Sequence, residues 1–224
     1  MIKFFGIGSA FNPEEGSTSA YIKEKDHLII FDSGPSTFLA AKSLLHQFKP
    51  DHIHIFITHT HTDHVGSLGQ MIDYIFYALE GRANLYHPSE DIRTLLQLMK
   101  VIPEKYHFFS EKEIAVNQRY FTFYPTSHVG ECYGILIKEK DQTIDYTGDC
   151  CEIKNLDRFL AGDIHTMYLD VADVATPVHL LYDDLYRLVT EKKDRERIVL
   201  MHFNTGFNKE RAKLDGFKLA EKEA

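Results

Sequence analysis

His59-Thr60-His61-Thr62-Asp63-His64 places three imidazoles and one carboxylate next to one another, just after the mostly apolar residues 53–57. The apolar stretch predicts a buried strand, so the histidines begin where that strand ends. Side chains at the carboxyl end of a strand line the usual ligand site of αβ proteins. Neutral imidazoles and carboxylates are the ligands that zinc and similar ions prefer. The stretch therefore predicts a metal site.

The spacing of these side chains favours two ions over one. His59 and His61 alternate along the chain and His64 follows after a turn, so the three imidazoles cannot all point the same way. Two neighbouring ions, each taking part of the cluster, fit this pattern better. The alternative is a solvated loop that is rich in histidine by chance, and three histidines with one aspartate after a buried strand make it the weaker interpretation.

Other histidines and aspartates also stand at the ends of predicted strands. His128 falls in a loop between two strand-like stretches, Asp149 ends a third, and His202 directly follows a fourth. Taken alone, His128 or His202 would be interpreted as a hydrogen-bonded structural histidine. Their common placement at strand ends favours metal ligands.

With these residues in view, the chain resembles the metallo-β-lactamase fold superfamily, whose signature is HxHxDH after a strand. The resemblance covers nearly the whole chain, because the family's other motifs are matched in order by Phe31-Asp32-Ser33-Gly34, Ser127-His128, Tyr146-Thr147-Gly148-Asp149 and Leu200-Met201-His202-Phe203. It implies that one ion is held by His59, His61 and His128. It implies that the other is held by Asp63, His64 and His202, and that Asp149 bridges the two. Asp32 is expected to hold the histidine loop and not to bind an ion.

A second resemblance concerns catalysis. Gly6-Ile7-Gly8-Ser9-Ala10 is similar to the opening GxGSA of the phosphodiesterase-type branch, which includes the tRNA 3′-end processing endonucleases. Asp170 stands where that branch has a strand-ending glutamate, and His179 where it has a histidine opening a helix, here expected from Val178. In the family this histidine, paired with the acidic residue, protonates the leaving alkoxide. The resemblance thus implies catalytic roles for Asp170 and His179 beside Asp63; without it, His179 would be interpreted as structural.

The order of predicted elements indicates the fold class. Strand-like stretches come in meanders with helices added, twice along the chain, with helices expected at residues 36–47, 67–79 and 89–100 and from Val178 and Phe207. This order predicts an αββα sandwich of two mixed β-sheets flanked by helices. The charged, amphipathic residues 183–195 predict a solvated helix face.

The length of 224 residues allows one good core or two small domains, and we predict a single domain spanning residues 1–224. The 44% hydrophobic and 26% charged shares are those of an ordinary globular protein, and no linker or repeat interrupts the chain. No apolar run approaches the ~20 residues that a membrane span needs. The first residues read as a strand and not as a secretory signal. Three cysteines cannot pair completely, which fits a reducing compartment, so we expect a cytoplasmic protein.

The substrate class follows from the chemistry of two ions. Ions about 3.5–4 Å apart lower the pKa of a shared water and take up negative charge, which suits hydrolysis of a phosphodiester or an activated acyl bond. The sequence contains no GxSxG and no phosphate loop with lysine. Zn²⁺ is the expected metal, although Mn²⁺ and Fe²⁺ accept the same ligands.

Transfer RNA is disfavoured as a partner. Only 20 residues lie between His128 and Asp149, which leaves no room for the long basic arm of the tRNA-processing relatives. The formal net charge of −8 is opposite to that of a nucleic-acid binder. We therefore expect a dinuclear hydrolase of a small phosphodiester such as a cyclic nucleotide. A hydrolase of a carboxylic ester, lactone, thioester or β-lactam, and a metal-binding sensor without turnover, stay open as alternatives. A homodimer, the common state among relatives, is also left open.

Overall fold

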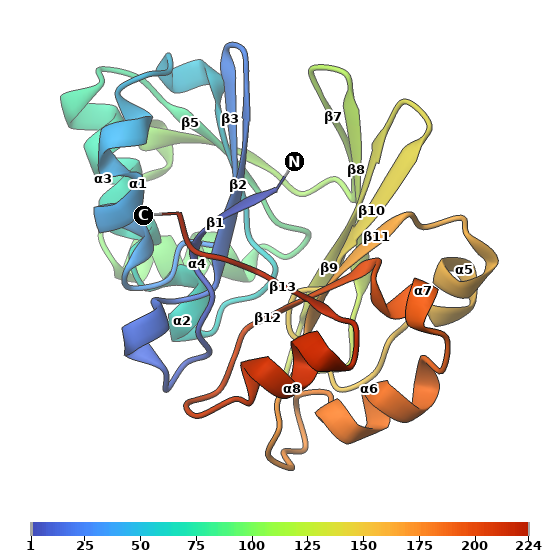
Figure 1. Cartoon of the computed structure of the whole chain (residues 1–224). Helices are drawn as coiled ribbons and strands as arrows, with labels where there is room; N and C mark the ends of the chain where they lie inside the picture. Colours follow the sequence, from blue (N-terminus) through green and yellow to red (C-terminus); the bar gives the residue numbers. More distant parts are fainter. Residues whose placement is uncertain (1, 224) are drawn as a thin grey trace. The chain divides into compact units, whose positions relative to one another are not determined.

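The computed structural model describes residues 2–223 and contains two mixed β-sheets, each accompanied by its own helices (Figure 1). One sheet has six strands in the order β1-β2-β3-β4-β5-β6, and the other has seven in the order β13-β12-β11-β10-β9-β8-β7. The chain divides into two compact units, the first running to Glu111 and including the end of the chain from Glu221, the second spanning Lys112–Ala220. The predicted pair of mixed sheets with flanking helices is confirmed. That the chain forms a single domain stays a prediction.

The first unit holds the six-stranded sheet. Its strands are β1 (Lys3–Gly6), β2 (Ser19–Glu24), β3 (His27–Phe31), β4 (Ile53–Phe56), β5 (Ala83–Tyr86) and β6 (Tyr106–Phe109). Its helices are α1 (Thr37–Leu45), α2 (Thr62–Val65), α3 (Leu68–Ala78) and α4 (Asp91–Leu98), with short 3-10 helices η1 (Pro13–Glu15), η2 (Pro50–His52) and η3 (Pro103–Lys105). Strands β1 to β3 are antiparallel, whereas β3 to β6 are parallel. The carboxyl ends of β3 and β4 therefore meet at one edge of the sheet.

The core of the first unit lies between this sheet and helices α1, α3 and α4, which cover one of its faces (Figure 1). Ile53 and Ile55 of β4 point into that core, and Phe56 points to the opposite face, as the two-residue period of a strand requires. On that opposite face Phe56 stacks on Tyr86 with ring centroids 4.4 Å apart. With both faces covered, β4 is buried throughout, and its last residues are held firmly where the histidine stretch begins.

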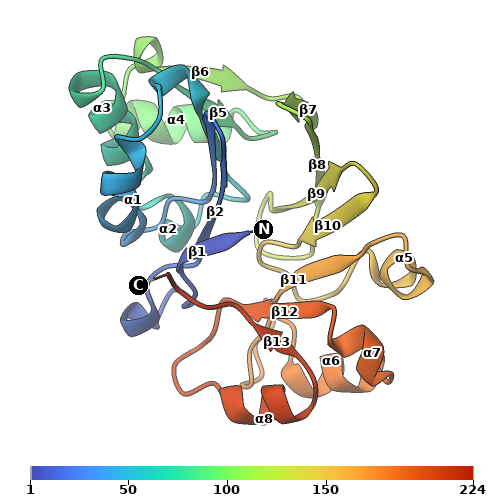
Figure 2. The ribbon, with the colours of Figure 1, turned by 45° about the horizontal axis from the view of Figure 1, so that its top comes forward.

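The second unit holds the seven-stranded sheet. Its strands are β7 (Glu113–Val116), β8 (Arg119–Pro125), β9 (Tyr133–Glu139), β10 (Gln142–Tyr146), β11 (Thr166–Asp170), β12 (Ile198–Met201) and β13 (Lys218–Leu219). Its helices are α5 (Leu156–Ala161), α6 (Tyr182–Leu188), α7 (Lys192–Arg195) and α8 (Lys209–Leu214). Strands β7 to β10 form an antiparallel meander, and β10 to β13 are parallel (Figure 2). The carboxyl ends of β10, β11 and β12 thus share one edge.

The predicted helix from Val178 is wrong, because α6 begins only at Tyr182. Val178 lies in a loop whose backbone forms hydrogen bonds with residues distant in the sequence. The Leu180 N–H donates to the Cys150 carbonyl over 2.8 Å, and the Ala172 N–H donates to the Leu180 carbonyl over 2.9 Å. These tertiary hydrogen bonds replace the helical ones. The helix predicted over residues 183–195 is likewise two short helices, α6 and α7, separated at the buried Val189. Between residues 2 and 223 no helix is long and apolar enough to cross a membrane.

Candidate metal centre

The histidine stretch of the first unit folds into a short loop and one helical turn. Helix α2 begins directly after His61, whose carbonyl accepts the backbone N–H groups of His64 and Val65 over 2.9 and 3.1 Å. The turn places His64 Nε2 3.2 Å from an oxygen of Asp63. The ring centroid of His59 lies 4.7 Å from that of His61 and 4.1 Å from that of His64. The structure therefore brings together all four predicted ligands of this unit.

The carboxylate of Asp32 holds this loop through hydrogen bonds. It is fully buried and accepts the Thr58 N–H over 2.8 Å, the Thr58 hydroxyl over 2.9 Å, and His64 Nδ1 over 2.9 Å. A carboxylate can only accept, so His64 Nδ1 carries the proton and Nε2 is the nitrogen with which His64 could bind a metal. The expectation that Asp32 holds the histidine loop is confirmed.

The same chain of hydrogen bonds orients His59. Because the Thr58 hydroxyl donates its proton to Asp32, its oxygen accepts from His59 Nδ1, which lies 3.1 Å away. His59 therefore also presents Nε2. Sequence reasoning missed Thr58, although its position directly before His59 was a usable signal.

Gly34 lets the loop after β3 pass close beneath α2. A Cβ at Gly34 would lie 1.9 Å from the Asp63 carbonyl oxygen and 2.4 Å from the Ser17 Cβ, so no larger residue fits. The neighbouring Ser33 N–H donates to the His64 carbonyl over 2.7 Å. The glycine after Asp32 thus fixes the backbone of two predicted ligands.

The second unit gathers the remaining predicted ligands around Asp149. His128 Nε2 lies 3.7 Å from Oδ2 of Asp149, and His202 Nε2 lies 3.5 Å from its Oδ1. One carboxylate oxygen therefore faces each imidazole, as a bridging carboxylate would require. Two ligands of one tetrahedral zinc ion, with bonds of about 2.1 Å, stand about 3.4 Å apart. The three nitrogen–oxygen separations found in the two units fit that value.

His128 is oriented by the backbone. Its Nδ1 donates to the Val178 carbonyl over 3.0 Å, so Nε2 is the nitrogen with the available lone pair. Sequence reasoning missed this contact, because a backbone carbonyl from a distant loop leaves no signal in the residue pattern. The Asp149 main chain is held in turn by the Thr126 hydroxyl, which donates to its carbonyl over 3.0 Å.

Asp170 ends β11 and connects three groups. Its fully buried carboxylate accepts His202 Nδ1 on Oδ1 over 3.1 Å. Its Oδ2 accepts both His179 Nδ1 over 2.7 Å and the Cys150 N–H over 3.0 Å. Asp149, Asp170, His179 and His202 together offer ligand atoms within 4.8 Å of one another. Asp170 thus orients a predicted metal ligand and the predicted proton donor at once.

His179 stands at the solvent side of this group, with its side chain 20% exposed. The Thr176 hydroxyl accepts its backbone N–H over 2.9 Å, which fixes the loop without a helix. Burial lowers the pKa of His179, but the hydrogen bond and negative charge of Asp170 outweigh that effect, so its pKa is raised. The arrangement holds Nδ1 on Asp170 and leaves Nε2 as the atom that can exchange a proton with a bound molecule.

The cysteines after Asp149 do not supply a thiolate from position 150. Cys150 is buried, and burial together with the charge of Asp170 raises the pKa of its thiol well above the usual value. Cys132, Cys150 and Cys151 form no disulfide in the described chain. Cys150 therefore behaves as a small apolar residue.

A small cavity of about 160 Å³ lies beside the histidine stretch of the first unit. It is lined by the β1–β2 loop, the turn after β3 and the start of α2: Ser9, Ala10, Asn12, Pro13, Gly16, Ser17, Pro35, Ser36, Thr62 and Asp63. It is therefore adjacent to a predicted ligand and lined mostly by small uncharged groups.

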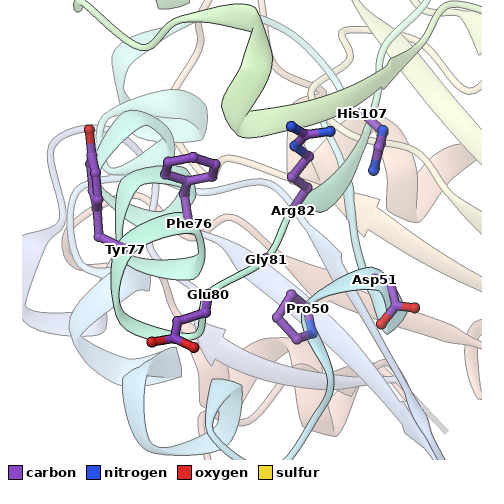
Figure 3. A pocket seen from close by; sticks show the side chains of 8 residues that line it. All are labelled: Pro50, Asp51, Phe76, Tyr77, Glu80, Gly81, Arg82 and His107. Atoms are coloured by element: carbon purple, nitrogen blue, oxygen red, sulfur yellow. The ribbon is translucent and has the colours of Figure 1, made fainter.

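A larger cavity of about 670 Å³ lies at the opposite edge of the same sheet, where β4, β5 and β6 begin (Figure 3). It is lined by Pro50, Asp51, Phe76, Tyr77, Glu80, Gly81, Arg82 and His107. Arg82 and His107 lie near each other, but Asp51 and Glu80 add two carboxylates. It contains none of the predicted ligands, and its mixed charge gives no preference for an anionic phosphodiester. The candidate site therefore remains at the carboxyl ends of the strands.

A family model and a phage protein match most or all of this chain. The family model described as Anti-Pycsar protein Apyc1 matches residues 1–224. The Anti-Pycsar protein Apyc1 of Bacillus phage 010DV004 is 26% identical over 234 aligned positions, which cover 88% of this chain and 86% of the phage protein.

Solved structures match the whole chain in fold. The metallo-β-lactamase fold protein YhfI from Bacillus subtilis superposes with a TM-score of 0.78 at 14% identity, covering 100% of this chain and 97% of that one. The short form of human tRNase Z superposes with a TM-score of 0.70 at 18% identity, covering 99% and 96%. At these identities the likeness establishes the fold, and the predicted metallo-β-lactamase fold is confirmed.

Proposed function

This chain belongs to the Anti-Pycsar protein Apyc1 family, and from that premise we propose that it hydrolyses a cyclic nucleotide with the help of two bound metal ions. Membership makes the chain a metal-dependent hydrolase of the metallo-β-lactamase fold, as the sequence predicted. Cyclic nucleotide degradation is the activity associated with the family, and it agrees with the small phosphodiester expected from the residues.

One observation carries the proposal: four imidazoles hold their Nδ1 atoms on protein acceptors. The acceptors are the Thr58 hydroxyl for His59, Asp32 for His64, the Val178 carbonyl for His128 and Asp170 for His202. Each imidazole thereby presents Nε2, the arrangement typical of histidines that bind a metal.

We assign the ligands as the family resemblance implies. His59, His61 and His128 would hold one ion, Asp63, His64 and His202 the other, and Asp149 would contribute one oxygen to each. The donor set of imidazoles and carboxylates suits Zn²⁺, and Mn²⁺ or Fe²⁺ accept it as well. When bound, such a pair supplies an activated water near neutral pH and positive charge for the phosphoryl oxygens.

The chain's own residues complete the reaction. Ring opening of a cyclic phosphodiester breaks the bond from phosphorus to an alkoxide of high pKa, which needs a proton as it leaves. His179 would give that proton from Nε2, and the hydrogen bond from its Nδ1 to Asp170 supports this role. Asp170 keeps the imidazole in the tautomer and orientation that proton transfer requires. We therefore propose that His179 is the general acid and Asp170 its positioning residue.

The proposal extends to the size of the substrate, the compartment and the oligomeric state. A small substrate suits the formal net charge of −8, which disfavours tRNA as a partner. The described cysteines form no disulfide, which agrees with a reducing compartment, so we propose action in the cytoplasm. A homodimer stays a proposal that a sedimentation measurement would decide.

A substrate panel tests the function. The Zn²⁺- or Mn²⁺-loaded protein is incubated with 3′,5′-cyclic nucleotides, a linear dinucleotide, a lactone, a thioester and a β-lactam, and products are separated by liquid chromatography. We expect conversion of cyclic nucleotides to nucleoside monophosphates at a kcat/KM at least ~10⁴ M⁻¹s⁻¹, the lower range for enzymes on their own substrates. Preferential turnover of the lactone or thioester would refute the phosphodiesterase assignment. No turnover of any compound would favour a metal-binding sensor.

A further inference from the structure

Phe11 presents its ring to solvent in the first unit, with 90% of the residue exposed. It lies in the loop between β1 and β2, and its two neighbours, Ala10 and Asn12, line the 160 Å³ cavity. Asp63 lines the same cavity. Phe11 is therefore an exposed aromatic residue in the turn between two residues that line a cavity, and that cavity reaches a predicted metal ligand.

The backbone beneath this ring is tightly fixed. The Asn12 N–H donates to the Ser9 carbonyl over 3.0 Å and closes a turn with Ala10 and Phe11 at its corner. The Gly8 N–H donates to the Gly16 carbonyl over 2.7 Å, which ties the two ends of the loop together. A Cβ at Gly8 would lie 2.4 Å from the Asn12 carbonyl oxygen, so the turn packs against this glycine without spare room. A ring on such a base can contact a ligand at little cost in conformational entropy.

The chemistry of the cavity indicates what the ring would contact. Of the described residues that line it, Asp63 alone carries a charge, and that charge is negative. Ser9, Asn12 and Ser36 offer hydroxyl and amide groups. An uncharged ring with polar edges is suited to these hydroxyl and amide groups. At about 30 Å³ per water the cavity holds the equivalent of about five waters, enough for one edge of a ring and too little for a whole nucleotide.

We propose that Phe11 stacks on the nucleobase of the substrate and determines the preference for a phosphodiester that carries a base. The ring of a base lies over Phe11 while its polar edge enters the cavity beside Asp63. Base–aromatic stacking contributes about 5- to 150-fold to binding, converted from measured alanine substitutions. This inference rests on the proposed function, because it assigns the part of the substrate that the metal ligands do not contact.

A cycle of two substrates and three enzymes tests the contact. The substrates are a 3′,5′-cyclic nucleotide and methyl riboside 3′,5′-cyclic phosphate, which has a methoxy group in place of the base. The enzymes are the wild type, Phe11→Ala and Phe11→Trp, with Leu39→Ala as a matched control, since Leu39 is 81% exposed on α1 of the same unit. We expect Phe11→Ala to lower kcat/KM for the nucleotide about 5- to 150-fold and to bring it down to that for the base-free compound. Phe11→Trp should retain the preference, and Leu39→Ala should match the wild type.

The outcomes separate this inference from the function beneath it. If the wild type hydrolyses cyclic nucleotides but Phe11→Ala lowers kcat/KM for both substrates equally, or for neither, the stacking contact is refuted and the function stands. Equal wild-type turnover of the two substrates would refute it as well. If the wild type, loaded with metal, turns over neither substrate, the proposed function fails and the inference fails with it.

Discussion

Replacing Asp170 by Asn tests how the second unit orients its ligands, because the change removes one acceptor without removing volume. The carboxylate uses Oδ1 for His202 and Oδ2 for both His179 and the Cys150 N–H. Asparagine has a single oxygen, and its amide nitrogen can only donate. One side of the residue must therefore face a group to which it can no longer bond as before.

The two orientations of the new amide differ in cost. With its nitrogen toward Cys150, two donors would confront each other at a backbone N–H that has no other form. With its nitrogen toward His202, the imidazole can respond by moving its own proton from Nδ1 to Nε2. The second orientation costs less free energy, and it removes the Nε2 lone pair with which His202 would bind a metal. Loss of such a supporting carboxylate typically lowers metal affinity about 10- to 100-fold, or about 1.4–2.7 kcal/mol.

Metal affinity is measured by competition with a chromophoric chelator, for Asp170→Asn and for the control Asp145→Asn. Asp145 is an equally buried carboxylate on the neighbouring strand β10, but it bonds to Tyr124 and Asn155 and to none of the predicted ligands. We expect weaker binding of one ion in Asp170→Asn and unchanged affinity in the control. Affinity within about twofold of the wild type in Asp170→Asn would refute the tautomer reasoning, which places the loss well above that.

Four further changes extend the test. His64→Ala should lower the metal content by one ion per chain in elemental analysis, while Asp149→Ala should weaken both ions and nearly abolish turnover; two retained ions with near wild-type activity would place the bridge elsewhere. His179→Ala should slow hydrolysis of an alkyl phosphodiester by about 10²–10⁴-fold but a p-nitrophenyl ester far less, because p-nitrophenolate leaves without a proton; equal losses would exclude it as the acid. Burial, with the charges of His27 and His52, lowers the pKa of His54 from 6.5 to about 3. Between those values the unfolded chain binds a proton that the folded chain does not, so His54 should make the free energy of unfolding fall by about 2 kcal/mol from pH 7 to pH 5, measured with urea. His54→Gln should lack this part of the pH dependence, and an identical slope in both proteins would contradict it.

The parts of the fold that could be predicted from sequence are those in which local pattern and tertiary packing agree. For residues 53–57 the local pattern predicts a buried strand, and the packing of the folded chain also buries this segment, where β4 lies. The helix predicted from Val178 does not form, because hydrogen bonds from Leu180 to Cys150 and from Ala172 to Leu180 replace those of a helix. Such partners are far away in sequence, so no local pattern contains them.

The site, like the fold, could be predicted from the sequence only in part. The residue types and their positions at strand ends predicted which side chains gather, and within each unit they do gather. What orients them was only partly visible: Asp32 was expected from its motif, whereas the Val178 carbonyl that holds His128 belongs to a loop with no signature. The role of Asp170 as a common acceptor for His179 and His202 also required coordinates, because it depends on which oxygen faces which ring.

The central claim is that two ions in this chain make a cyclic nucleotide phosphodiesterase. Metal-free protein is titrated with Zn²⁺ or Mn²⁺ while the rate of 3′,5′-cyclic nucleotide hydrolysis is followed. We expect the rate to rise with added metal and to reach its maximum at two equivalents per chain. A maximum at one equivalent, or no hydrolysis at any ratio with either metal, would contradict it.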